Sequence, residues 1–272
     1  MKLAVSNLAW PVADDTAAAA VLRTCGVRGV ELAPSKVWEC APYVVEGAAE
    51  SYAGWWRDAD CAVVAFQAIL FGHAELDLFG DDPIVAALRQ HLSAMGRLAA
   101  RCGASVLVLG APANRRKGRR LMSDAVTAAA RALRPAVEEL ASVGVSLCIE
   151  PNPPRYGCDF VNTAAEAAQL VEAVGHPNCG IHLDTAALAL SGETTAKALA
   201  PIIRQVRHVH LSEVDLVPVG TSESVPHDAL GAALQSLGYD GWLSVEMRAG
   251  AADAWRDALP RAVAVARTSY GC

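Results

Sequence analysis

Eight short apolar runs recur along the chain, and each is followed by an alanine-rich stretch with helical character. Runs that are apolar on both faces are typical of parallel strands covered by helices. Dividing 272 residues among eight units leaves about 34 residues for each, which suits one strand, one helix and two short loops. The pattern predicts an α/β fold, a (β/α)8 or TIM barrel of one domain over residues 1–272, with strands near 3–8, 28–33, 62–67, 104–109, 146–150, 180–184, 206–211 and 242–246.

Two local signals refine this prediction. Pro135 lies inside the helical stretch 123–143, and we expect it to kink or divide that helix. Alternating strands and helices also suit a doubly wound sheet. However, no Gly-x-Gly-x-x-Gly motif follows the first strand, which argues against a dinucleotide-binding fold.

Composition limits the classes of protein that fit. The chain is 53% hydrophobic, which allows a large core, and its formal net charge is −6, which gives no general attraction for nucleic acid or an anionic membrane. It has neither an apolar run of the roughly 18–20 residues that cross a bilayer nor the apolar stretch of a signal peptide, so we expect a cytoplasmic protein. The eight cysteines include no Cys-x-x-Cys pair and are expected to be reduced.

Polar residues end four successive strands in the second half of the chain: Glu150, Asp184, His210 and Glu246. In this fold the active site lies at the carboxyl ends of the strands, so these side chains should meet at one rim. Three carboxylates cannot converge without strong mutual repulsion, which a divalent cation would remove. Oxygen-rich ligation with one nitrogen suits manganese, magnesium or cobalt, and zinc stays a candidate. The sequence therefore predicts one divalent metal ion.

The segments around these residues resemble those of xylose isomerase-like TIM barrels, in particular the sugar phosphate isomerase/epimerase family. The likeness rests on ligand spacings of 34, 26 and 36 residues and on the motifs Glu150-Pro151-Asn152, Leu183-Asp184-Thr185, His210-Leu211-Ser212-Glu213 and Ser244-Val245-Glu246. The resemblance implies that Glu150 and Glu246 are catalytic. One would remove a proton beside a metal-polarised carbonyl to give an enediolate, and the other would return a proton.

Three positions depart from the ketose 3-epimerases of that family. Ala187 and Leu216 replace the His and Arg usual there, and Gly157 follows Arg155-Tyr156 where an acid is usual. We therefore expect an intact metal centre with a replaced set of hydroxyl-binding residues, which argues against a free ketohexose as substrate. Phosphorylated and acidic substrates are left open.

Further side chains are candidates for substrate binding: Trp10, Glu31, His73, Arg115, Arg155 and His182. Core packing is the alternative for Trp10, an ion pair for Glu31 and a solvated position for His73. His182 and His208 precede ligand positions by two residues, so they should point inward one layer lower, where a buried, hydrogen-bonded role is favoured. The five cations of Arg115–Arg120 suggest a solvated loop, with attraction of a phosphate or carboxylate as the alternative.

These features favour a metal-dependent isomerase or epimerase of a small-molecule, sugar-like substrate. The alternative is a lyase that dehydrates a cyclic keto-polyol or a dehydroshikimate-like acid after the same proton abstraction. The acidic charge and the low number of histidines, seven, disfavour a nucleic-acid enzyme, and the four ligand-type residues disfavour a non-catalytic scaffold. A homodimer is left open, and no nucleic acid or membrane partner is expected.

Overall fold

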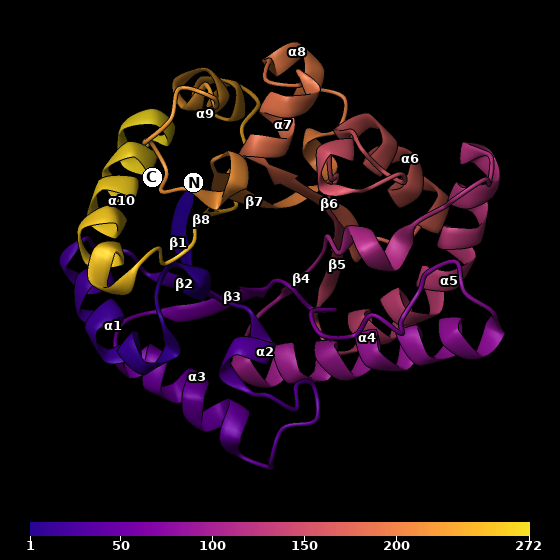
Figure 1. The fold of residues 1–272 in the computed structure, drawn as a ribbon, viewed down its shortest axis with the longest axis horizontal. Coiled ribbons are helices and arrows are strands. Elements are labelled where there is room, and N and C mark those ends of the chain that lie inside the picture. Colours follow the sequence, from indigo (N-terminus) through magenta and orange to yellow (C-terminus); the bar gives the residue numbers. More distant parts are fainter.

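The structure, a computed structural model, describes residues 1–272 apart from the side chain of Ala252. Eight parallel strands close into a barrel in sequence order, with β1 pairing to β8 (Figure 1). The predicted α/β barrel is therefore confirmed. The strands are β1 (Lys2–Ser6), β2 (Gly29–Leu32), β3 (Ala62–Phe66), β4 (Val106–Leu109), β5 (Ser146–Ile149), β6 (Cys179–Asp184), β7 (Val206–Ser212) and β8 (Trp242–Glu246).

Helices form a ring around the strands (Figure 1). Their alanine, leucine and valine residues pack with the strands into one large buried core, because each amphipathic helix can bury its apolar face only there. The helices are α1 (Asp15–Thr24), α2 (Pro34–Val37), α3 (Ala48–Asp58), α4 (Asp82–Cys102), α5 (Met122–Ser142), α6 (Ala164–Val174), α7 (Thr185–Ser191), α8 (Ala196–Leu199), α9 (His227–Ser236) and α10 (Trp255–Tyr270).

The strands lie where the sequence predicts them, and one boundary difference shapes the rim of the barrel. β1 ends at Ser6, two residues earlier than predicted. The Ser6 hydroxyl accepts a hydrogen bond from the backbone N–H of Leu8 at 3.2 Å, which starts a short 3-10 turn over Asn7–Ala9. This turn places Leu8 in the wall of a cavity described below.

Helix α5 runs unbroken through Pro135, so the predicted division of this helix does not occur. A proline removes the N–H that would bond to the carbonyl four residues earlier, here that of Arg131. Arg89 on α4 supplies a substitute donor: its Nη2 lies 3.4 Å from the Arg131 carbonyl, and its Nε donates to the Ala132 carbonyl at 2.9 Å. A contact between two helices thus replaces the bond that the proline removes.

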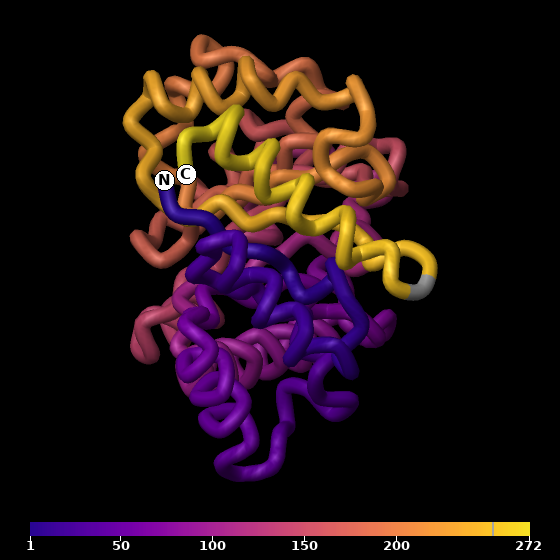
Figure 2. The backbone as a smooth tube through the Cα atoms, turned by 90° about the vertical axis from the view of Figure 1, so that its left-hand side faces the viewer, coloured from indigo at the N-terminus to yellow at the C-terminus, as the bar shows by residue number. Residues whose placement is uncertain are grey.

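The two ends of the chain lie side by side (Figures 1 and 2). The backbone N–H of Lys2 donates to the Gly241 carbonyl at 3.0 Å, which joins the start of β1 to the loop before β8. No helix of the described chain is long and apolar enough to cross a bilayer. The eight cysteines are free thiols, and five of them are buried.

Replacing Arg89 tests the account of Pro135. We expect Arg89→Ala to lower the free energy of unfolding by about 1 kcal/mol, because a helix carbonyl loses its partner. In the Pro135→Ala background the same change should cost less, since the restored N–H bonds to that carbonyl. Urea denaturation of the four proteins measures this coupling. Arg97→Ala, an exposed change on the same helix, should alter stability by less than about 0.5 kcal/mol. Equal costs of Arg89→Ala in both backgrounds would contradict the account.

Candidate metal centre and active site

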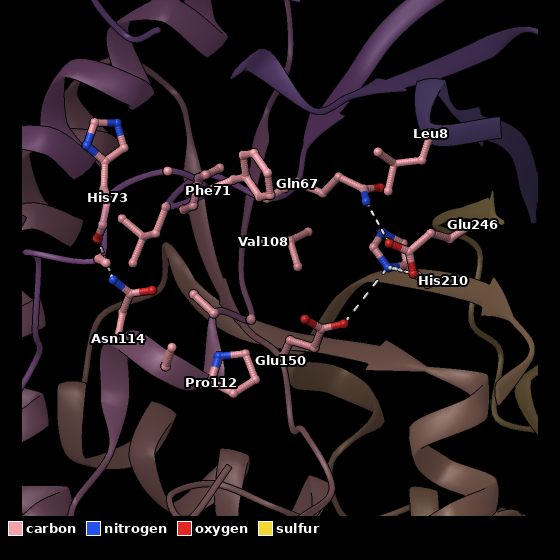
Figure 3. Close-up of a pocket in the computed structure, with 18 residues that line it drawn as sticks. Leu8, Gln67, Phe71, His73, Val108, Pro112, Asn114, Glu150, His210 and Glu246 are labelled. Carbon is pink, nitrogen blue, oxygen red and sulfur yellow. Dashed lines mark hydrogen bonds and ion pairs between the residues drawn. The ribbon is translucent and has the colours of Figure 1, made fainter. Parts of the chain in front are cut away.

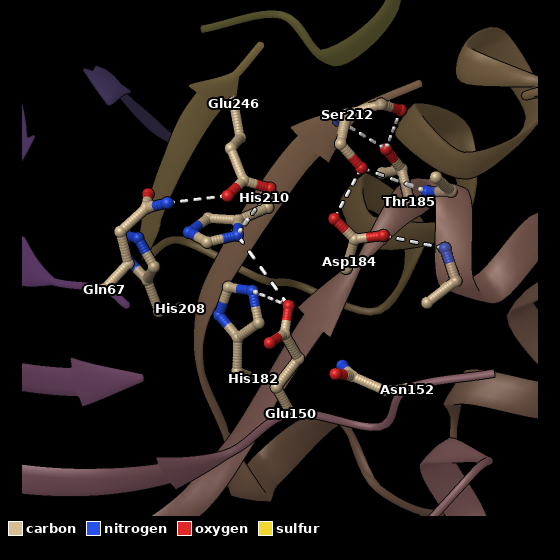
Figure 4. A network of polar contacts seen from close by, with 12 residues as sticks. Gln67, Glu150, Asn152, His182, Asp184, Thr185, His208, His210, Ser212 and Glu246 are labelled. Atoms are coloured by element: carbon tan, nitrogen blue, oxygen red, sulfur yellow. Dashed lines mark hydrogen bonds and ion pairs between the residues drawn. The ribbon is translucent and has the colours of Figure 1, made fainter. Parts of the chain in front are cut away.

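The four predicted ligands lie at the carboxyl ends of neighbouring strands. Glu150 follows the last residue of β5, Asp184 and Glu246 end β6 and β8, and His210 lies near the end of β7. Because these strands are adjacent in the barrel, their side chains converge at one rim (Figure 4). The fold therefore brings together residues that lie up to 96 positions apart in the sequence.

His210 is the common neighbour of the carboxylates. Its Nδ1 lies 3.3 Å from Glu246 Oε2 and 3.9 Å from Glu150 Oε1. Asp184, His210 and Glu246 each offer a ligand atom within 4.8 Å of the others. Two ligands that each lie about 2.1 Å from one ion are at most about 4.2 Å apart, so both measured distances are compatible with a shared ion.

Glu31 on β2 holds the other nitrogen of His210. Its fully buried carboxylate lies 3.0 Å from His210 Nε2 and 3.2 Å from His208 Nε2. Burial raises the pKa of Glu31, but His210 and His208 outweigh it and hold that pKa well below its ordinary value. A carboxylate on Nε2 favours the tautomer in which Nδ1 carries the lone pair, as is common for metal-binding histidines.

Without a cation the carboxylates compete for protons. Burial raises the pKa of Glu150 to about 8, with Asp184 and Glu246 adding to the rise and His210 opposing it. Burial and Glu246 likewise raise the pKa of Asp184 to about 6. Burial lowers the pKa of His210, but Glu31 and Glu246 outweigh it and hold that pKa well above its ordinary value. Near neutral pH the metal-free site therefore keeps protons that a divalent ion would displace.

Residues of other strands orient the carboxylates. Gln67, directly after β3, donates from Nε2 to Glu246 Oε1 at 2.6 Å. Asp184 accepts from the backbone N–H of Ala187 at 2.7 Å through Oδ1 and from the Ser212 hydroxyl through Oδ2. These bonds fix both carboxylates before any ion arrives. Gln67 and Ser212 were not among the predicted site residues, although Gln67 ends the predicted third strand and the same strand-end argument would have found it.

The donor set fits a divalent ion. His210 Nδ1 is buried and has no hydrogen-bond partner within the described chain, although it faces acidic groups. Buried polar atoms without a partner are rare, and coordination would satisfy this one. Three carboxylates and one imidazole are also the donors that manganese, magnesium and cobalt accept.

Two cavities open on these residues, and we name each by a residue in its wall. The Phe71 cavity, about 500 Å³, extends from Glu150 and Glu246 to Phe71 (Figure 3). The Arg248 cavity, about 550 Å³, extends from the same two glutamates to Arg248. Glu150 and Glu246 line both cavities, so they lie where the two cavities adjoin. Two of the three positions that depart from the ketose 3-epimerase pattern, Ala187 and Leu216, line the Arg248 cavity.

Gly110 and Arg115 control the placement of Glu150. A Cβ atom at Gly110 would lie 2.1 Å from Glu150 Oε2, so a larger residue there would displace that carboxylate. Arg115 is 2% exposed, and its Nη2 donates to the Glu150 backbone carbonyl at 2.6 Å. The predicted substrate contact of Arg115 is therefore corrected: its side chain is buried against the backbone of Glu150. Among the described residues, no cation of Arg115–Arg120 lines either cavity.

Trp10 is a core residue and not a substrate contact. Its ring has no exposed surface, and its centroid lies 6.0 Å from that of Trp56 and 6.3 Å from that of Trp255. Its Nε1 donates to Asp15 Oδ1 at 2.7 Å. The predicted stacking on a substrate ring is thus wrong, because both faces of the indole are covered by protein.

Glu31 and His182 also lie below the cavities. Glu31 adopts the ion-pair alternative, because its carboxylate is taken up by His208 and His210. His182 has no exposed surface and lines neither cavity, so the favoured buried position is confirmed and the alternative, a substrate contact, is wrong. Its Nε2 lies 3.7 Å from Glu150 Oε1, and neither ring nitrogen has a hydrogen-bond partner in the described chain, whereas His208 is hydrogen-bonded as expected.

The remaining two candidates are His73, which lines one cavity, and Arg155, which contacts a residue of the other. His73 lines the Phe71 cavity far from the metal-ligand residues, and its Nδ1 lies 3.0 Å from Glu75 Oε1 (Figure 3). Arg155 pairs through Nη2 with Asp215 Oδ2 at 2.7 Å. Asp215 lines the Arg248 cavity but Arg155 does not, so any effect of Arg155 on substrate would pass through Asp215.

Comparison with known proteins identifies the family. A family model described as xylose isomerase-like TIM barrel matches residues 19–266. The chain belongs to this family. Over 104 residues it is 30% identical to a ketose 3-epimerase from Arthrobacter globiformis, a stretch that covers 38% of this chain and 35% of that protein. The matched stretches of the curated relatives span 35% to 47% of those proteins.

Solved structures share the fold of this family member over its whole length. D-psicose 3-epimerase from Clostridium cellulolyticum H10, solved with D-tagatose, superposes with a TM-score of 0.82 at 17% identity, and both chains are covered completely. The IOLI protein, solved with a zinc atom, superposes with a TM-score of 0.73 at 16% identity, covering 99% of this chain and 96% of that one.

Glu31→Gln tests the role of the buried contact between Glu31 and His210. We expect this change to weaken Mn²⁺ binding by about 10–100-fold, because the amide no longer fixes the His210 tautomer. Isothermal titration calorimetry measures the affinity, and circular dichroism checks that the variant is folded. Glu50→Gln, at an exposed carboxylate, is the control and should leave affinity unchanged. Unaltered affinity in Glu31→Gln would show that the pair does not support the site.

The raised carboxyl pKa values predict a pH dependence. Above about pH 6.5 the histidines of lowered pKa, His91, His182 and His227, are largely neutral in both the folded and the unfolded chain. From there to about pH 8 the metal-free folded chain keeps a proton on Glu150 that the unfolded chain has lost, so its stability should fall over this range by about 2 kcal/mol. Mn²⁺ replaces that proton, so stabilisation by Mn²⁺ should grow over the same range. Urea denaturation with chelator and with Mn²⁺ measures both trends. A Mn²⁺ stabilisation independent of pH would contradict the prediction.

Proposed function

We propose that this protein is a divalent-metal-dependent epimerase or isomerase of a small polyhydroxy carbonyl compound. One observation carries the proposal: Glu150 and Glu246 approach His210 from two sides at the junction of the two cavities (Figure 4). Two carboxylates on opposite sides of one carbon are what inversion by proton transfer requires.

Each residue has a distinct role in this proposal. The ion would be held by Glu150, Asp184, His210 and Glu246. A bound divalent ion polarises the substrate carbonyl, which makes the adjacent C–H more acidic. One glutamate takes the proton from that carbon to give an enediolate, and the other returns a proton to the opposite face. Gln67 occupies Glu246 Oε1, which leaves Oε2 as the freer oxygen for proton transfer.

The relatives support epimerisation over the lyase alternative. The curated relatives that match parts of the chain are ketose 3-epimerases, and dehydration would need the further expulsion of a β-hydroxyl. Their substrates are not carried over directly, because Ala187 and Leu216 change the Arg248 cavity. We propose a modified keto-sugar in place of a free ketohexose.

Several finer points remain predictions from the sequence. The oxygen-rich donor set favours manganese, magnesium or cobalt, and the zinc atom in the IOLI protein keeps zinc as the alternative. A single domain over residues 1–272, a cytoplasmic location and a homodimer also remain predictions. A small-molecule substrate is consistent with the size of both cavities.

Conservative glutamate variants test the proposed chemistry. We expect Glu150→Gln and Glu246→Gln each to retain some metal but to lose turnover by about 10²–10⁴-fold, because the amide keeps an oxygen ligand and removes the base. NMR in heavy water follows incorporation of deuterium beside the carbonyl of a keto-sugar. In a two-base epimerase each variant should still exchange the substrate proton from one direction only.

The controls separate metal binding from proton transfer. Chelation should abolish exchange in the unaltered protein, and Mn²⁺ or Co²⁺ should restore it. Glu138→Gln, at an exposed carboxylate of α5, should exchange at the normal rate. Near-normal turnover in both site variants with metal bound would remove Glu150 and Glu246 from the acid–base roles.

A further inference from the structure

The Phe71 cavity is apolar beyond the metal-ligand residues. Its walls beyond those residues are formed largely by hydrophobic side chains from β4 and from the loops after β1, β3 and β4 (Figure 3). Those that carry the argument are Leu8, Ile69, Leu70, Phe71, Val108 and Pro112. A ketone with hydroxyl groups along its whole length is a poor match to such a surface, because buried hydroxyls need hydrogen-bond partners.

The two side-chain amides in this cavity already donate within the protein. Asn114 Nδ2 donates to the carbonyls of His73 and Leu76 at 2.7 and 2.6 Å. The Gln67 amide donates to Glu246 at 2.6 Å. A sugar hydroxyl placed in the outer cavity would therefore give up its bonds to water and find few replacements, which costs free energy.

A buried acceptor without a partner lies at the inner end of the cavity. Gln67 Oε1 is buried and has no hydrogen-bond partner in the described chain. Because the same amide is bonded to Glu246, this acceptor is next to the ligand residues. The cavity thus has a polar inner end and a middle lined mainly by hydrophobic side chains, with His73 and Asn114 at its far end (Figure 3).

Phe71 forms the outer wall of the apolar part. The residue is 73% exposed and lines the cavity, so its ring is accessible to a ligand there. The turn that presents it begins at Ala68, whose backbone is in the left-handed region at φ 52°, and is closed by the Phe71 N–H bonding to the Ala68 carbonyl at 3.0 Å. This turn holds the aromatic ring at the edge of the cavity, where a flat apolar group can pack on it.

We propose that the substrate is a keto-sugar that carries an aromatic substituent, and that this substituent occupies the Phe71 cavity. This inference rests on the proposed function, which places the hydroxy-ketone at Glu150 and Glu246. The substituent packs on Phe71, Leu8 and Pro112.

Binding of unreactive glycosides tests the subsite apart from catalysis. Phenyl and methyl β-glucoside differ only in the aglycone, and calorimetry with the Mn²⁺-loaded protein compares their affinities. We expect the affinity of phenyl β-glucoside to exceed that of methyl β-glucoside by a ratio of about ten or more. Phe71→Ala and Leu8→Asn should reduce that ratio towards one, since both side chains are partly exposed and their replacement spares the core. Leu121→Ala, at an exposed leucine outside the cavity, should keep the ratio. Equal affinities in the unaltered protein would overturn the proposal.

Turnover separates this inference from the proposed function. The probes are the 3-keto forms of the same two glucosides, and deuterium incorporation beside the carbonyl is followed by NMR. A kcat/KM at least about tenfold higher for the phenyl compound supports the subsite. Exchange of both compounds with equal kcat/KM overturns the subsite and leaves the proposed function standing. If neither compound nor a free ketohexose exchanges, the proposed function fails, and the calorimetric ratio alone decides whether the cavity holds an aromatic group.

Discussion

The constraint that organises this site is the electrostatic repulsion among three largely buried carboxylates, those of Glu150, Asp184 and Glu246, at one rim of the barrel. Burial and mutual repulsion raise the pKa of Glu150 to about 8 and that of Asp184 to about 6. Buried carboxylates that repel one another either keep protons or share a cation. A divalent ion is the simplest resolution, since it would satisfy the carboxylates and the unpartnered Nδ1 of His210 together.

The first half of the barrel supports the ligands that the second half supplies. Glu31 from β2 orients His210, and Gln67 after β3 orients Glu246. Gly110 after β4 leaves room for the Glu150 carboxylate, and Arg115 holds the Glu150 backbone. These four residues belong to no sequence motif, because each acts through one contact with a residue that is distant in the sequence. Their combined effect is a preorganised site on a rigid scaffold.

The sequence predicted the barrel and the convergence of the four ligand-type residues because both follow from strand periodicity and topology. The depth of two other candidates could not be predicted, because Trp10 is covered by two other indoles and Arg115 is turned under Glu150. Whether a side chain at a strand end is buried or exposed to a cavity depends on which neighbouring side chains pack around it. Pro135 shows the same limit, because a contact from Arg89 on another helix offsets the bond that the proline removes.

Counting bound ions tests the central claim most directly. The purified protein, stripped with chelator and titrated with Mn²⁺, can be followed by electron paramagnetic resonance, in which bound and free Mn²⁺ are distinguished. The account predicts one tight site per chain, and loss of that site in His210→Ala while Lys197→Ala, at a distant surface position, retains it. No bound Mn²⁺ in the unaltered protein, or the same tight site in His210→Ala, would contradict the claim that these four side chains hold one ion.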